Sequence, residues 1–241
     1  MESFRSSVIS EPYFLEFTLR TYGKGRPDQR LNGRLYGGIN LNGPVSLVEV
    51  TDGSDLRDPA RYLIQNGAIP LVWRAGVGQV ESKILRGEAL SRPLFDTDVT
   101  PFDLQLPYLY WTDFIYEGLT RFRGRPTDVF ILYPPADERD LYPEISGVRL
   151  YLDSQFDSMV QAEILDLDSE VTKSIALLEI RKVDGTWIAK TIDVRMPDGT
   201  KTRFRVAAAR MNCSWDPNLF EPENLQDPLP VVPETDLVRV D

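Results

Sequence analysis

The chain has 241 residues, of which 42% are hydrophobic, and it carries a formal net charge of −10. This length suffices for one large β domain or two small ones. The negative charge argues against nucleic acid and against electrostatic docking on anionic lipid, because phosphates would be repelled. The chain has no histidine and one cysteine, Cys213. Ser-His-Asp and Cys-His catalytic sites, His-containing zinc sites and an internal disulfide are therefore excluded, and we expect no metal.

The start of the chain leaves the compartment open. No apolar run approaches the roughly 18 residues that span a bilayer. Residues Met1 to Ser10 contain no charged segment followed by an apolar one, as a signal peptide would. Either the protein is cytoplasmic, or the numbering begins after a removed signal.

Alternating apolar residues indicate strands in the first third of the chain. Residues 13–20, 30–41 and 45–50 alternate with a period of two, which places one face of each strand against a core. Residues 61–65 are ambiguous between a short strand and a helical turn. A further strand at 69–74 follows the Asn-Gly turn at 66–67, and a weak one is expected at residues 79–85.

The segment from Leu90 to Trp111 interrupts the strand pattern. Thr100, Pro101 and Asp103 have the types expected at the N-cap, first and third positions of a helix. Apolar residues follow with irregular helical spacing. We interpret this segment as a short helix that caps the core, with a movable apolar lid as the functional alternative.

Strands return in the second half of the chain. Residues 114–120 and 127–133 form a predicted pair, and five more strands follow between Gly147 and Met211. Asp-Gly pairs at 184–185 and 198–199 are typical hairpin turns, because both residues tolerate a positive φ. The sequence thus predicts an antiparallel meander with one continuous apolar face.

The last segment differs in composition from the strands. Residues from Cys213 onward include five prolines and seven acids against one base, Arg239. Such composition rarely buries enough apolar surface to become ordered. We expect a single β domain over residues 1–225 and an acidic Pro-rich tail over 226–241, loose beyond Asp227.

About ten or eleven strands with one helical interruption can form a single sheet only if that sheet curls. The predicted fold is mainly β: a curved antiparallel half-open barrel, with short helices covering its concave face. Basic residues on the last strand, Lys201, Arg203 and Arg205, share one face with Arg195 on the preceding strand. We interpret them as an outer face paired with acids, and a carboxylate or phosphate clamp is the alternative.

Several segments resemble the outer-membrane lipoprotein-sorting and carrier superfamily, the LolA/LolB-like proteins. Residues 96–225 carry the resemblance, through Asp96–Asp103, Gly147–Asp153, Met159–Leu165, Trp187–Met196, Gly199–Phe204 and Asp216–Phe220. The resemblance implies the same half-open barrel, located in the periplasm, with acyl chains of a lipid or lipoprotein as ligands. It further implies an outer-membrane receptor or inner-membrane exporter as partner, and neither catalysis nor a cofactor.

An acyl-chain cavity would be lined by apolar residues on the inward register. The predicted walls are Phe17, Leu35, Trp73, Phe102, Trp111, Leu150, Leu152, Ile164, Leu178, Ile192, Val194, Met196 and Phe204. Two alternatives remain at this point. One is an envelope structural or interaction module with a filled core, which binds partners through a sheet edge or the tail. The other is a carbohydrate-active enzyme, for which the sequence shows no placed pair of acids.

Overall fold

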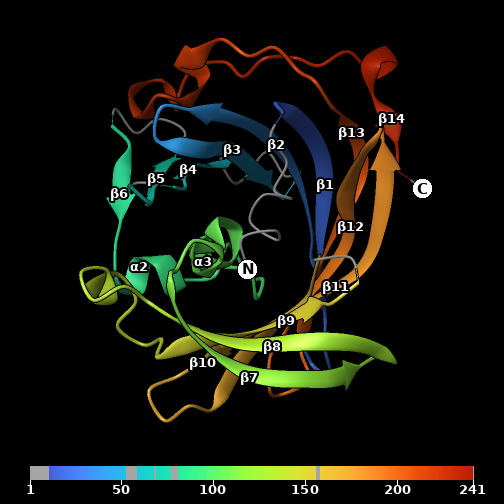
Figure 1. Cartoon of the computed structure of the whole chain (residues 1–241). Coiled ribbons are helices and arrows are strands. Elements are labelled where there is room, and N and C mark those ends of the chain that lie inside the picture. Colours follow the sequence, from blue (N-terminus) through green and yellow to red (C-terminus); the bar gives the residue numbers. More distant parts are fainter. Residues whose placement is uncertain (1–10, 53–58, 68, 77–80, 156–157, 241) are drawn as a thin grey trace.

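A single antiparallel sheet of 14 strands curls round a short helical segment in the computed structural model (Figure 1). The described residues are 11–52, 59–67, 69–76, 81–155 and 158–240. The expectation about a signal peptide concerns residues 1–10, which lie outside this set, as do residues 79–80 at the start of a predicted strand. The predicted fold class, a curved antiparallel sheet with short helices on its concave side, is confirmed.

The strands fall into two meanders. The first six are β1 (Tyr13–Tyr22), β2 (Arg30–Asn40), β3 (Gly43–Thr51), β4 (Ala60–Gln65), β5 (Leu71–Gly76) and β6 (Lys83–Leu85). The others are β7 (Asp113–Phe122), β8 (Arg125–Tyr133), β9 (Gly147–Asp153), β10 (Ser158–Leu165), β11 (Val171–Val183), β12 (Thr186–Arg195), β13 (Lys201–Arg210) and β14 (Val238–Arg239).

Pairing between β1 and β13 joins the two meanders into one sheet. The order runs from β6 through β5, β4, β3 and β2 to β1, and then from β13 down to β7. Strands β6 and β7 are thus the two edges of this path, and the sheet is open between them. Strand β14 pairs with β13 at Ala208 and Ala209, beyond Arg205, where the pairing of β13 with β12 ends.

The sheet has more strands than the ten or eleven predicted, for local reasons. The ambiguous segment at 61–65 is strand β4, in which five of six residues are buried. Tyr62 and Ile64 point to one cluster of apolar side chains and Leu63 to another. A strand buried on both faces lacks polar alternation, so its period is hidden in the sequence. Strand β14 has two residues, too few to show a period, whereas β6 lies within the weak strand expected at residues 79–85.

Short helices occupy the concave side and the ends of the sheet. They are α2 (Glu88–Ser91), α3 (Pro101–Gln105) and the 3₁₀ helices η1 (Pro107–Leu109), η2 (Arg139–Leu141), η3 (Pro217–Phe220), η4 (Pro222–Asn224) and η5 (Glu234–Asp236). Figure 1 shows α2 and α3 inside the curve of the sheet. No helix within the described ranges is long and apolar enough to cross a membrane.

The C-terminal segment lies on the outer face of the first meander. Its residues Phe220 and Leu225 pack with Tyr36, Leu47 and other outward side chains of β1 to β5. Figure 1 shows this segment, in red, running along the outside of the curve towards β14. The sequence predicted a loose segment beyond Asp227. Instead, Val240 is buried. The apolar residues between the prolines pack on an apolar outer face of the sheet, which the sequence did not reveal.

Candidate functional site

Helix α3 covers the concave face and begins where the sequence predicts. The Thr100 hydroxyl accepts a hydrogen bond from the Asp103 backbone N–H at 3.3 Å, and the Asp103 carboxylate accepts one from the Thr100 N–H at 2.8 Å. Pro101 occupies the first turn. This reciprocal capping satisfies two backbone donors that a helix start would otherwise leave unpaired. The helix ends at Leu106, whose φ of 52° is left-handed.

Aromatic rings pack this cover against the connection between β8 and β9. The Phe102 ring lies 5.4 Å from Tyr142 and 6.4 Å from Trp111, measured between ring centroids. Trp111 and Tyr108 are almost fully buried. Burial raises the pKa of the Tyr108 phenol, and the nearby Asp103 carboxylate adds to this effect. Aromatic groups of this kind bury large apolar areas, so the middle of the concave face is filled by the protein's own side chains.

Two ion pairs fasten the same segment to the sheet, one to the second meander and one to the connection between β1 and β2. The Lys173 ammonium on β11 donates to the Asp103 carboxylate at 2.7 Å, and both side chains are nearly buried. Before the helix, Asp98 accepts hydrogen bonds from Arg26 at 2.5 Å and from the Thr202 hydroxyl at 2.8 Å. Because each buried carboxylate has a cationic partner, burying these charges is tolerated. The cover is therefore held at its rim by polar links.

A cavity of about 410 Å³ opens between this cover and strands β10 to β12. Its apolar wall includes Phe102, Ile145, Ile164 and Met196. Its polar wall includes Asp98, Asp103, Glu144, Asp166 and Lys173. This volume lies in the range of known small-molecule pockets, and its two-sided lining suits a ligand with an apolar and a polar end.

Most of the predicted wall residues lie together on the concave face. Seven are buried in the largest apolar cluster, namely Phe17, Phe102, Trp111, Leu150, Leu152, Ile164 and Val194. Leu35, Ile192 and Phe204 pack against the same cluster and are partly buried. Met196 lines the cavity just after β12, on the same side as Ile192 and Val194.

Two predicted wall residues lie elsewhere. Trp73 packs on the outer face with Leu63 and the C-terminal segment, because its neighbour Val72 takes the inward position on β5. Leu178 falls at an irregularity between Leu177 and Glu179, where the register of β11 against β12 shifts, and it belongs to none of the apolar clusters. An inserted residue of this kind reverses the alternation that places side chains on one face.

Sequence reasoning missed the polar residues of the site. Lys173 lies two residues before the buried Ile175 and therefore on the same face of the strand, so the strand pattern could have predicted an inward lysine. Asp98 and Asp103 lie in the acidic run before and within the helix. Arg26 and Thr202, the partners of Asp98, are 72 and 104 residues away from it, and local spacing does not reveal such contacts.

A family model described as "Uncharacterized protein" matches residues 81–227, more than half of the chain. The chain belongs to this family. The matched region runs from before β6 through α2, α3 and the second meander to the residues after η4. It therefore contains the helical cover and most of the cavity wall. No curated protein matches the sequence.

Solved structures share the fold of this family member over nearly its whole length. A DUF1329 family protein from Desulfovibrio piger has a TM-score of 0.79 at 15% identity, covering 93% of this chain and 95% of that one. A domain described as outer membrane lipoprotein-sorting, from Vibrio parahaemolyticus, has a TM-score of 0.79 at 14% identity, covering 93% and 96%. A LolA superfamily protein from Nitrosomonas europaea has a TM-score of 0.70 at 12% identity, covering 91% and 96%. The fold is LolA-like, as the resemblance implied.

Proposed function

We propose that the protein is a non-catalytic carrier that holds the acyl chains of a lipid or lipoprotein in the periplasm, for sorting to the outer membrane. One observation carries this proposal: a strip of half-buried apolar side chains continues from the cavity along the concave face. Ile192 and Phe204 lie opposite each other on β12 and β13 and are half-buried, and Met196 lines the cavity on the same face, beyond the buried Val194. A solved structure of the same fold is described as a lipoprotein-sorting domain, which supports the proposal.

The energetics favour a long apolar chain over a compact polar ligand. Each methylene group that leaves water contributes about 0.8 kcal/mol, so affinity grows with the length buried along the strip. The polar groups of the cavity wall, with the exposed Glu144 among them, suit the end of the ligand that stays near water. An outer-membrane receptor or an inner-membrane exporter would exchange the cargo.

Substituting Met196 with Trp tests the proposed path. The larger ring fills the cavity beside Ile164, so we expect the affinity for a dansyl-labelled fatty acid to fall by about tenfold or more. Fluorescence titration of the purified protein measures this affinity, and circular dichroism checks the fold.

The matched control is Leu178→Trp, which adds the same ring at a half-buried position outside the apolar clusters. We expect its affinity to equal that of the wild type. Absence of saturable binding by the wild type, together with no lipid in mass spectra of protein purified from its own envelope, would refute the carrier function.

An interaction module remains the second candidate, because edge strand β7 exposes apolar side chains. Phe114 is 42% exposed, Ile115 55% and Leu119 66%. Such an edge accepts a further strand from a partner. The variant Ile115→Lys/Leu119→Lys separates the two functions. It should keep acyl binding if the protein is a carrier, and it should lose only partner capture if β7 recruits a protein.

A further inference from the structure

Three arginines stand directly opposite one another across neighbouring strands on the outer face of the sheet. Arg20 on β1 is paired in register with Arg30 on β2 and with Arg203 on β13. The adjacent residues Leu19 and Phe204 belong to the concave cluster, so the arginines point to the opposite face. Like charges directly opposite each other destabilise a sheet, and an acid would be expected between them.

Acids neutralise only part of this charge. Arg20 donates two hydrogen bonds to Asp28, at 2.9 and 2.7 Å, and Arg203 donates two to Asp193, at 2.6 and 3.0 Å. Among the described residues, no acid forms an ion pair with Arg30 or with Arg205, which lies one position further along the same face of β13.

The arginines line a hollow of about 460 Å³ on this outer face. Arg20, Arg30, Arg203, Arg205 and Arg239 all contribute to its wall, and no acid does. From outside the wall, Glu16 and Glu234 form long ion pairs with Arg239, at 3.8 and 3.9 Å, so Arg30 and Arg205 carry the free charge. The ring of Tyr22, also in the wall, lies 5.3 Å from the Arg20 guanidinium and 5.7 Å from that of Arg203. Cation–π contacts of this kind fix the direction of a guanidinium group.

Composition makes this concentration of positive charge informative. The chain has 37 acids and 27 Lys or Arg residues, so a wall with five arginines and no acid is not its average surface. An adjoining hollow on β1 to β3 contains Glu16 and Glu49 beside Arg30 and Arg34, so the unopposed charge is confined to one place.

We propose that this hollow is a binding site for a phosphate group, carried either by a soluble phosphate or by a phospholipid headgroup. Guanidinium groups match phosphate oxygens with paired N–H donors, and groups arriving from three strands surround a tetrahedral anion better than a planar one. A bound phosphate would also replace the repulsion across the Arg30, Arg20 and Arg203 row by attraction. The site is on the face opposite to the acyl strip and does not depend on the proposed carrier function.

Calorimetric titration with sodium pyrophosphate at fixed ionic strength tests the site. We expect saturable binding to the wild type and a loss of about tenfold or more in affinity for Arg30→Gln/Arg205→Gln. Both residues are exposed and form no ion pair with another described residue, so this variant should fold. Without phosphate, its melting temperature should equal or exceed that of the wild type, because repulsion is relieved. Pyrophosphate should raise the melting temperature of the wild type alone.

The matched control is Arg121→Gln/Arg181→Gln, which removes two exposed arginines outside the hollow. It should bind pyrophosphate as the wild type does. Equal loss in both variants, no binding by the wild type, or equal affinity for malonate would overturn the proposal. Competition by phosphatidylglycerol vesicles, but not by phosphatidylcholine vesicles, would identify a lipid headgroup as the source. Pyrophosphate binding that vesicles leave unchanged would identify a soluble phosphate.

Discussion

At the scale of single residues, Asp193 shows how the outer face tolerates a buried acid. Its side chain has no exposed surface and accepts hydrogen bonds from Arg203, Lys201 and Arg195. Burial by itself works to raise the pKa of this carboxyl group. The three donors outweigh burial and hold the pKa at about 2, below its usual 3.8. The strand pattern of the sequence placed four basic residues on one face. Three of them, Arg195, Lys201 and Arg203, are therefore structural partners of Asp193, and the fourth, Arg205, makes no such pair.

This lowered pKa makes stability depend on pH in the acid range. A group whose pKa is lower in the folded state stabilises the fold above its unfolded pKa and loses that contribution as pH falls through the folded pKa. Asp193 should thus contribute about 2 kcal/mol above pH 4 and lose it towards pH 2. Urea unfolding of Asp193→Asn should show a deficit at neutral pH that shrinks as the pH falls to 2. A deficit that stays constant with pH would contradict this assignment.

At the scale of elements, α3 depends on its surroundings. Five residues are far fewer than an isolated helix needs in water, because nucleation is costly. Its start is fixed locally by Thr100 and Asp103, and its position is fixed by Lys173 on β11. The Asp103 carboxylate therefore serves both the cap and the contact with the sheet.

Replacing Lys173 with Met should destabilise the protein by about 3–5 kcal/mol, because a buried carboxylate loses its cation. Adding Asp103→Asn should restore part of this loss, since the amide keeps an oxygen for the cap. Guanidinium unfolding of the single and double variants measures both effects.

Lys190→Met provides the control, because Lys190 pairs with the more exposed Glu179 at 3.3 Å. Its cost should stay below about 1 kcal/mol. If Lys173→Met cost no more than this control, α3 would not be held by the ion pair.

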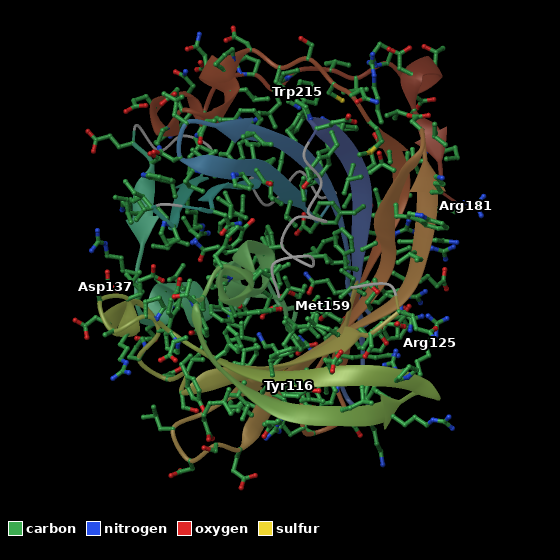
Figure 2. All side chains as sticks on the ribbon, viewed as in Figure 1. Tyr116, Arg125, Asp137, Met159, Arg181 and Trp215 are labelled. Carbon is green, nitrogen blue, oxygen red and sulfur yellow. The ribbon has the colours of Figure 1, made fainter. Side chains whose placement is uncertain are left out.

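At the scale of the whole molecule, the sheet has apolar side chains on both faces of its first meander. Figure 2 shows side chains filling the space inside the curve, with Met159 among them, while Trp215 belongs to the C-terminal segment outside the curve. The Trp215 indole donates a hydrogen bond to the Gly37 carbonyl at 3.0 Å, and the Tyr36 hydroxyl donates one to the Pro230 carbonyl at 3.0 Å. The C-terminal segment thus closes a second core on the outside of the curve.

Deleting residues 228–241 should uncover this second core. Leu229, Val232 and Leu237 pack against it, and burial of one such side chain contributes about 1.5–3 kcal/mol. We expect the free energy of unfolding to fall by about 3 kcal/mol or more and the binding of the dye ANS to rise. An unchanged urea midpoint would contradict this expectation and support the loose tail that composition predicted.

Glu234→Gln/Asp236→Asn is the control for this deletion. It removes two acids but keeps the apolar residues, so its stability should stay within about 0.5 kcal/mol of the wild type. Comparing the two variants separates apolar covering of the sheet from the acidity of the segment.

The sequence alone determined the local features of this protein. Alternation placed most of the strands, the Asp-Gly pairs placed their turns, and Thr100 to Asp103 placed the start of α3, because each depends on neighbours within a few residues. The tertiary structure decided which face each apolar residue joins. Trp73 and Tyr36 lie on the outer face since the C-terminal segment, more than 140 residues later, covers them. The row of Arg30, Arg20 and Arg203 likewise exists only because β1 pairs with β13, and long-range pairing of this kind leaves no local pattern.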